Sequence, residues 1–140
     1  MAEEPTTPDL VELVRGLVEP TNRRDFHAMM SLYAPDAVHD TSRWKMGTHE
    51  GLPAVRRLFE DWIGAYEEFE IELEEILDLG NGVVLAVLSQ SARTVGSSDH
   101  VRLRAAWIYE WADGMIVRVT SYPDIDEGRT AAEQLAKSRE

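Results

Sequence analysis

The sequence predicts an α+β domain: a curved antiparallel sheet wraps around three N-terminal helices, and a short helix follows at the C-terminal end. Apolar residues recur at helical spacing in the first half of the chain. In the second half, branched and aromatic residues alternate with polar ones, separated by the turn dipeptides Asn81-Gly82 and Asp113-Gly114. Helices gathered on one side of such a sheet predict that the sheet wraps around them and leaves a conical apolar cavity.

Capping residues and hydrophobic spacing predict the first helix. Thr7 suits its N-cap, and Pro8 suits its first position, where the fixed φ and missing N–H of proline are tolerated. Apolar residues then recur at helical spacing over residues 10–18. We expect Pro20 to end or kink this helix, because proline cannot donate the backbone hydrogen bond.

Two more helices are predicted around a short strand. One helix covers residues 25–33, and Pro35 ends it before a strand over residues 37–41. A loop over residues 41–51 leads to the third helix, which begins near Leu52. The apolar face of this helix is broad enough to pack against a sheet and consists of Val55, Leu58, Phe59, Trp62, Ile63 and Tyr66.

Residues 69–79 fit two patterns. Their apolar residues continue the helical spacing of the preceding segment, but they also alternate with glutamates as in a half-buried strand. The dipeptide Asn81-Gly82 favours the strand, because a hairpin turn of this type requires a strand on both sides. Six acids within residues 67–75 then form a solvated outer face of the sheet.

Three further strands and a helix complete the predicted fold. The strands cover residues 83–95, 100–111 and 115–122, and a polar helix follows with Asp124 as its N-cap. The middle strand has a polar face marked by His100, Arg102, Arg104 and Glu110. Its other face, expected to point into the cone, carries Val101, Leu103, Ala105, Trp107, Tyr109 and Trp111.

Composition narrows the range of functions. The 140 residues carry a formal net charge of −12, which argues against nucleic acid or an anionic membrane as partner. The absence of cysteine excludes disulfides and thiol chemistry. The N-terminal residues lack a signal-peptide pattern, and no apolar run approaches the ~20 residues of a membrane helix. We therefore expect one cytoplasmic domain over residues 8–137, preceded by a disordered segment of residues 1–7.

Several short motifs occur in a characteristic order. The segment Tyr33-Ala34-Pro35-Asp36-Ala37-Val38 precedes Gly51 at the third helix, and Asp113-Gly114-Met115-Ile116-Val117-Arg118-Val119 precedes Tyr122 and Asp124. With these motifs, the chain resembles the SnoaL-like branch of the nuclear transport factor 2-like superfamily over roughly residues 8–136. The resemblance implies a cone-shaped barrel with an interior pocket. It leaves the reaction open, since the superfamily contains isomerases, cyclases, hydrolases, dehydratases and noncatalytic binding proteins.

The resemblance also allows the superfamily's catalytic positions to be compared. The proton-shuttling aspartate of ketosteroid isomerases corresponds to Thr41, and Asp40 lies one residue away, facing the other side of the strand. Their oxyanion-hole tyrosine and protonated aspartate correspond to Leu17 and Trp107. The acid/base aspartate of SnoaL cyclases, and that of limonene epoxide hydrolases, corresponds to Ser121. By ungapped matching, none of these carboxylates is present.

The implied pocket is aromatic and has few polar groups. The residues expected to line it are Trp44, Phe59, Trp62, Gln90, Trp107, Tyr109 and Ser121. Buried aromatic side chains also dominate ordinary protein cores, so the same residues are compatible with a filled interior. If the interior is open, its apolar lining and the many acids that face solvent beside it suit an uncharged or cationic hydrophobic small molecule.

His39 is the candidate proton-transfer residue. Its position on the short strand gives it the inward orientation, and its ordinary pKa of about 6.5 suits a general base oriented by Asp40, Thr41 or Ser121. The plainer interpretation is a hydrogen-bonded structural histidine. His39, Asp40 and His49 match no metal-binding spacing, so we expect no metal and no other cofactor.

Two hypotheses follow from these observations. The first is a noncatalytic protein that binds a hydrophobic small molecule, based on the aromatic lining and the missing aspartates. The second is a cyclase-, isomerase- or hydrolase-like enzyme in which His39, with Asp40 or Thr41, transfers a proton on a polyketide- or steroid-like substrate. The resemblance also implies a homodimer, because many members of the superfamily dimerise through the outer sheet face, where Arg102 and Arg104 are expected to lie.

Overall fold

The strands form one curved sheet that is not closed into a barrel. The computed structural model describes residues 9–140. The sheet has six strands in the order β2-β1-β6-β5-β4-β3. Their bounds are β1 Tyr33–Asp40, β2 Thr48–Glu50, β3 Tyr66–Gly80, β4 Val83–Thr94, β5 His100–Ala112 and β6 Met115–Tyr122. Strands β3 to β6 form an antiparallel meander, and β1 joins it by running parallel to β6.

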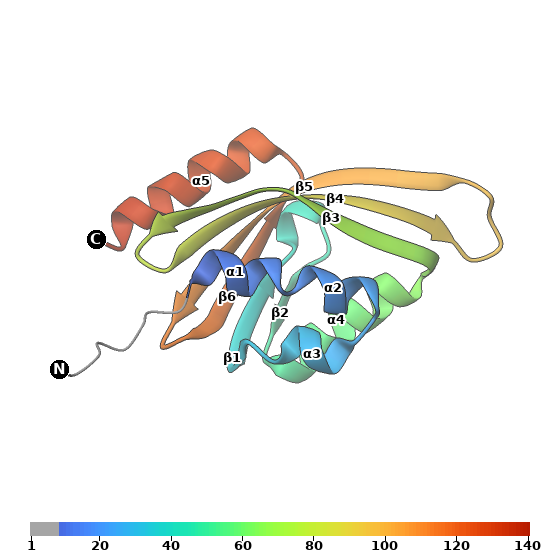
Figure 1. Ribbon diagram of the computed structural model, residues 1–140, viewed down its shortest axis with the longest axis horizontal. Coiled ribbons are helices and arrows are strands. Elements are labelled where there is room, and N and C mark those ends of the chain that lie inside the picture. The colour runs from blue at the N-terminus through green and yellow to red at the C-terminus, as the bar shows by residue number, and fades with distance from the viewer. Residues whose placement is uncertain (1–8) are drawn as a thin grey trace.

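Helices cover both faces of this sheet (Figure 1). On the concave side lie α1 Leu10–Arg15, α2 Val18–Asn22, α3 Phe26–Met30 and α4 Leu52–Gly64. On the opposite side, α5 Ile125–Ser138 lies across the sheet near the β3–β4 turn. This arrangement confirms the predicted α+β class, with N-terminal helices inside a curved sheet and a C-terminal helix outside it.

Side chains alternate between the two faces of β4 and β5, so these strands contribute to two separate hydrophobic cores. Side chains of one parity, including Val84, Leu88 and Tyr109, join the core under the N-terminal helices. Side chains of the other parity, including Leu85 and Ile108, pack under α5. The concave core is the one that surrounds the cavity described below.

Gly128 allows α5 to approach the sheet closely. A Cβ atom at this position would lie 2.6 Å from the Cβ of Ala106 and 3.2 Å from the Cβ of Tyr122. A larger residue would therefore push the helix off the sheet.

The structure confirms the predictions for the second half of the chain. The acidic segment is the long strand β3, and its glutamates at positions 68, 70, 72 and 74 are exposed while Phe69 is buried. Asn81 and Gly82 both have positive φ in the turn between β3 and β4. The Asp124 side chain caps α5 by accepting a hydrogen bond from the Glu127 N–H at 3.0 Å.

Two predictions for the first half were wrong because sheet pairing competes with local helical signals. The helix predicted over residues 25–33 is only α3, and Tyr33 instead begins β1, paired with Ile116 of β6. Pro35 therefore lies inside β1, at a register shift between Tyr33 and Val38 where the regular ladder is interrupted. The loop predicted over residues 41–51 contains β2, which pairs antiparallel with β1.

The first helix is also interrupted earlier than predicted. The chain leaves α1 at Gly16, and α2 begins at Val18, so Pro20 lies in the first turn of α2. There proline is tolerated because the first N–H groups of a helix have no intrahelical acceptor.

The first helix also begins later than predicted: its N-cap is Asp9, which accepts a hydrogen bond from the Val11 N–H at 3.1 Å, so Thr7 is not the N-cap and Pro8 is not the first helical residue. The disorder predicted for residues 1–7 lies outside the described residues.

Candidate functional site

A cavity of about 200 Å³ lies between α4 and the concave face of the sheet. Its polar lining residues are His39, Thr41, Gln90 and Ser121. Its aromatic and aliphatic lining residues are Trp44, Trp62, Tyr66, Trp107, Met46, Leu58, Ile71, Leu88, Leu103 and Ala105. None of these side chains is an acid, lysine or arginine, so the cavity walls carry no formal charge while His39 is neutral.

Aromatic side chains fill the space beyond this cavity. Trp107 lies between α4 and the sheet, with its ring centroid 5.9 Å from that of Trp62 and 6.5 Å from that of Phe59. A neighbouring void of only about 30 Å³ is lined by Phe59, Tyr33 and Tyr109 among others. That volume is of the order occupied by one water molecule. The open part of the interior is therefore the cavity beside His39.

Strand register explains why distant residues face this cavity. Trp107 of β5 is paired with Ser121 of β6 on one side and with Ala86 of β4 on the other. Farther along the same face, Leu103 of β5 is paired with Gln90 of β4. Paired residues point to the same side of a sheet, so the alternation that buries Trp107 also turns Ser121 and Gln90 inward.

His39 is enclosed by aromatic rings. Only 1% of the residue is exposed, and its ring packs edge-to-face against Phe59 and Trp107 at centroid distances of 5.2 and 5.1 Å. Burial, assisted by His49 and opposed only in part by Asp40, lowers the pKa of His39 to about 3. The imidazole is therefore neutral at pH 7. Its buried Nδ1 atom has no hydrogen-bond partner within residues 9–140.

Gln90 presents a second buried polar group without a partner. The residue is 8% exposed and lies on β4 at the cavity wall. In the part of the chain that the structure describes, its Nε2 atom forms no hydrogen bond. Most buried side-chain polar atoms in proteins are hydrogen-bonded, so two such exceptions on one cavity require an explanation.

The segment of residues 41–47 contributes Trp44 to the cavity wall. The Trp44 indole donates a hydrogen bond of 2.8 Å to the Ser121 Oγ atom. The ends of the segment are tied together because the backbone N–H and the hydroxyl of Thr41 both donate to the Gly47 carbonyl, at 2.9 and 2.8 Å. Between these ends, Lys45 adopts a left-handed conformation with φ 61°. The segment is a closed turn pinned to β6 through Trp44.

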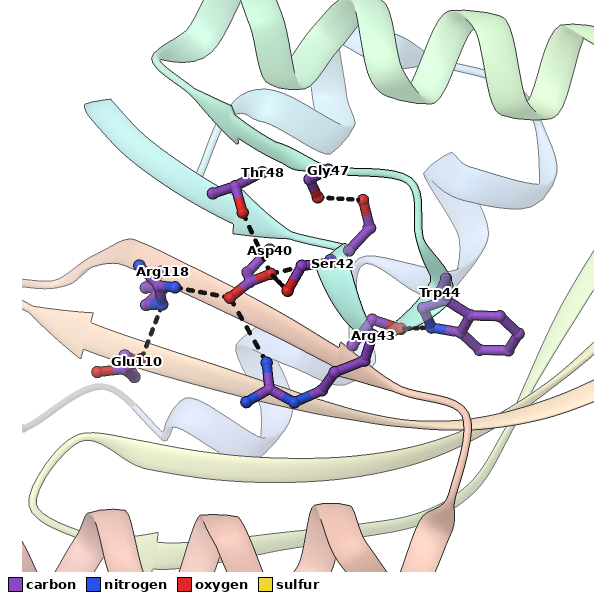
Figure 2. Close-up of polar contacts among 10 residues, drawn as sticks. Asp40, Ser42, Arg43, Trp44, Gly47, Thr48, Glu110 and Arg118 are labelled. Atoms are coloured by element: carbon purple, nitrogen blue, oxygen red, sulfur yellow. Dashed lines mark hydrogen bonds and ion pairs between the residues drawn. The ribbon is translucent and has the colours of Figure 1, made fainter.

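Asp40 lies on the other side of β1, outside the cavity (Figure 2). Its Oδ1 atom accepts hydrogen bonds from the Ser42 N–H at 2.9 Å and the Ser42 hydroxyl at 2.6 Å. Its Oδ2 atom accepts one from the Arg118 guanidinium at 2.8 Å, and Arg43 approaches it at 3.6 Å. In Figure 2 the Trp44 indole points away from this cluster. Asp40 thus holds the start of the segment that carries Trp44.

The partners of Asp40 keep it ionised. Burial acts to raise the pKa of Asp40, but the hydrogen bonds from Ser42 and Arg118 and the charge of Arg118 outweigh it and lower the pKa to about 2. Arg118 also lies 3.9 Å from a carboxylate oxygen of Glu110. The two carboxylates and the guanidinium form a small ion-pair network on the outer side of the sheet.

The structure separates the residues that the sequence grouped as one site. Trp44, Trp62, Gln90, Trp107 and Ser121 line the 200 Å³ cavity, as do His39 and Thr41. Phe59 and Tyr109 line the smaller void, Asp40 lies outside both, and His49 is hydrogen-bonded through its Nε2 atom to the Met46 carbonyl at 3.0 Å.

Lining residues that sequence reasoning did not select are Met46, Leu58, Tyr66, Ile71, Leu88, Leu103 and Ala105. The alternation along β3 and β5 carried a signal for Ile71, Leu103 and Ala105, which share a face with predicted inward residues. Met46 had no such signal, because its position depends on the turn between β1 and β2.

Two further features of residues 9–140 bear on function. No group of three or more histidine, aspartate or glutamate side chains in this range is placed to hold a metal ion. No helix in the same range is long and apolar enough to cross a membrane.

Comparison with known proteins identifies the family and the fold of the chain. The SnoaL-like domain family matches residues 14–119. An NTF2-like protein of unknown function from Burkholderia pseudomallei is similar with a TM-score of 0.72 and 18% identity, covering 90% of this chain and 98% of the other. A putative polyketide cyclase from Sinorhizobium meliloti has a TM-score of 0.67 and 24% identity, with coverages of 81% and 95%.

A third solved structure, TerC co-crystallised with polyporic acid, is similar with a TM-score of 0.69 and 14% identity, covering 89% of this chain and 97% of the other. No curated protein sequence matches the chain. At these identities the structural likenesses establish the fold and leave the reaction open.

Proposed function

The chain belongs to the SnoaL-like domain family, and we propose that it is a binding protein for a small, uncharged, hydrophobic molecule held beside His39. The observation that carries this proposal is the aromatic cavity of about 200 Å³ whose walls carry no acid, lysine or arginine. Ligand sites are typically concave and apolar with a few placed polar groups. The cavity is open to a ligand even though aromatic rings fill the neighbouring part of the interior.

Two of the structural neighbours support a ring compound as ligand. One is called a putative polyketide cyclase, and another was co-crystallised with polyporic acid. The cavity itself favours a ligand smaller than a steroid or an extended polyketide, since pockets for drug-sized molecules typically measure ~300–1,000 Å³. We therefore favour a compact ligand that packs between Trp62 and Trp107.

A titration with naphthalene tests the proposal. We expect the indole N–H resonances of Trp62 and Trp107 to shift in a saturable manner, because these rings line the cavity. Ala105→Phe fills the cavity and should remove the shifts, whereas Ala112→Phe, at the exposed end of β5, should retain them. Absence of any saturable shift in the wild-type protein up to the solubility of naphthalene would overturn the proposal.

The alternative enzyme hypothesis places proton transfer on His39. Its place on the cavity wall supports that role, but a histidine whose pKa is lowered to about 3 is a weak base at pH 7. Asp40, the predicted helper, lies on the far side of the strand and is occupied by Ser42 and Arg118. We therefore favour noncatalytic binding. Turnover of a cyclic ketone or epoxide that is abolished by His39→Ala would reverse this choice.

We also propose a homodimer through the outer sheet face beyond α5. There Glu70 and Glu72 of β3 lie across β4 from Arg102 and Arg104 of β5, so an acidic column runs beside a basic one. Two copies related by a twofold axis can place each column against the opposite charge. Sedimentation velocity should show a dimer that becomes monomeric in the double variant Arg102→Glu/Arg104→Glu. A wild-type monomer at all concentrations would contradict the proposal.

A further inference from the structure

Two residues on the cavity wall each carry a buried side-chain nitrogen that residues 9–140 leave without a hydrogen-bond partner: His39 through its Nδ1 atom and Gln90 through its Nε2 atom. We propose that the ligand is an uncharged compound of one or two fused rings that carries a hydroxyl or carbonyl oxygen, and that this oxygen accepts a hydrogen bond from the Gln90 amide. This inference rests on the proposed binding function and specifies the chemical class of the ligand.

The amide of Gln90 supplies the specificity. Gln90 is paired with Ile71 of β3 and Leu103 of β5 and shares its face of β4 with Leu88, and none of these side chains offers a hydrogen-bond acceptor. A buried N–H donor without an acceptor costs free energy, and a ligand oxygen at this position removes that cost. A hydrocarbon of the same shape fills the cavity but leaves the donor unsatisfied, so the oxygen distinguishes the two ligands.

His39 tolerates a second polar group and disfavours charge. A neutral imidazole has one N–H donor and one acceptor nitrogen, so its Nδ1 atom takes either role according to the tautomer. A ligand hydroxyl satisfies either tautomer because it both donates and accepts. An anionic ligand finds no lysine or arginine on the cavity wall, and a cationic ligand finds no carboxylate, so neither charge meets a group of opposite formal charge there.

The volume sets the size of the ring system. An engineered apolar cavity of about 150 Å³ binds benzene in another protein, so the cavity of about 200 Å³ has room for a second fused ring. Expansion of the cavity toward the smaller void is opposed, because Trp107 of β5 packs there against the aromatic rings of Phe59 and Trp62 of α4. We therefore exclude ligands with four fused rings.

Four probes test the three parts of the inference by calorimetry at pH 7 on the full chain. Naphthalene supplies two rings without oxygen, 2-naphthol adds a neutral hydroxyl, 2-naphthoate adds a negative charge, and 1-hydroxypyrene enlarges the ring system to four. We expect 2-naphthol to bind about five- to tenfold more tightly than naphthalene, as for one neutral hydrogen bond. We expect 2-naphthoate and 1-hydroxypyrene to bind more weakly than naphthalene.

Gln90→Met tests the residue assignment, because methionine keeps an unbranched side chain and removes the donor. In this variant the preference for 2-naphthol over naphthalene should fall below about twofold while naphthalene still binds. Gln134→Met on the exposed face of α5 is the matched control and should keep the full preference. Retention of the preference in Gln90→Met would overturn the role of Gln90.

The outcomes separate this inference from the proposed function. Equal binding of naphthalene and 2-naphthol by the wild-type protein would overturn the oxygen requirement while the binding function stands. Tighter binding of 2-naphthoate than of 2-naphthol would overturn the restriction to uncharged ligands, and tight binding of 1-hydroxypyrene would overturn the size limit. If naphthalene does not bind, the proposed function fails, and this inference fails with it.

Discussion

His39 and Asp40 are adjacent in the chain, yet the two faces of β1 place them in opposite situations. Asp40 is surrounded by donors from Ser42 and Arg118. His39 is surrounded by aromatic rings, and its Nδ1 atom has no partner within residues 9–140. Both residues are buried, and both have a lowered pKa, but the causes differ. Asp40 is kept charged by its partners, whereas His39 is kept neutral by the loss of water.

This difference separates a structural polar group from one that is free to contact a ligand. Every hydrogen bond of Asp40 is to this chain, and the result is an ordered turn before Trp44. His39 instead packs against aromatic rings, and its Nδ1 atom forms no hydrogen bond within residues 9–140. Mutations on the two faces should therefore affect different properties.

Asp40→Ala should have the largest effect on stability. It removes the acceptor for Ser42 and leaves the half-buried Arg118 without its closest carboxylate, which we expect to lower the free energy of unfolding by about 2–3 kcal/mol. Urea denaturation measures this loss. Asp36→Ala, at an exposed carboxylate of the same strand, is the matched control and should change stability by less than about 0.5 kcal/mol. Equal effects of the two substitutions would contradict a structural role for Asp40.

Acidification should then distinguish the two residues by pH. The pKa of His39 is lower in the folded chain than its ordinary 6.5, so the unfolded chain binds the proton first. Its contribution to stability is complete above about pH 6.5 and is lost as the pH falls, by about 1.4 kcal/mol per pH unit. Asp40 contributes fully above pH 3.8 and loses its contribution only as the pH falls toward about 2.

Urea denaturation between pH 7 and pH 5 measures the first of these windows. We expect the wild type to lose stability over this range and His39→Leu to lose much less of it. The exposed His27 serves as control, and His27→Gln should retain the wild-type slope. A His39→Leu variant with an unchanged slope would show that His39 is protonated equally in the folded and unfolded chain.

The orientation of His39 and the strand β3 were predictable because they depend on local pattern. The turn dipeptide Asn81-Gly82 predicts a hairpin, and a hairpin needs a strand on each side of its turn. Because side chains alternate along a strand, the glutamates are then predicted on the exposed face and Phe69 on the buried face. The same alternation placed Trp107 inside the cone. Such features follow from two or three neighbouring residues, so no knowledge of distant contacts is needed.

The partners of Asp40 and the shape of the cavity were not predictable from the sequence. Arg118 is 78 positions away, and the two residues meet only because β1 and β6 run in parallel. The same pairing draws Tyr33 out of the predicted helix and into β1. Whether aromatic side chains leave a cavity depends on how closely they pack in three dimensions. Around Phe59 and Tyr109 only the small void of about 30 Å³ remains, whereas the cavity of about 200 Å³ lies beside Trp44 and Trp62.

Ser121→Ala tests the junction between the two faces. Ser121 lies on the cavity wall and accepts the hydrogen bond from Trp44, so its removal leaves the indole N–H unpaired and should cost about 1 kcal/mol. We expect the Trp44 indole resonance to shift and broaden while the Arg118 side-chain resonances stay unchanged. Ser138→Ala, on the exposed end of α5, controls for loss of a hydroxyl. A change at Arg118 of similar size would mean that the two faces are coupled.

His39→Leu at pH 8 should have the smallest effect, and its sign is the most informative. Removing a fully buried side chain ordinarily destabilises a protein, but leucine replaces the imidazole with apolar volume and eliminates the unsatisfied Nδ1 atom. We therefore expect the free energy of unfolding to stay unchanged or to rise by up to about 1 kcal/mol, measured by urea denaturation. A loss above about 2 kcal/mol would mean that His39 forms stabilising hydrogen bonds in solution. It would then be a structural residue like Asp40, and the contrast between the two faces of β1 would no longer hold.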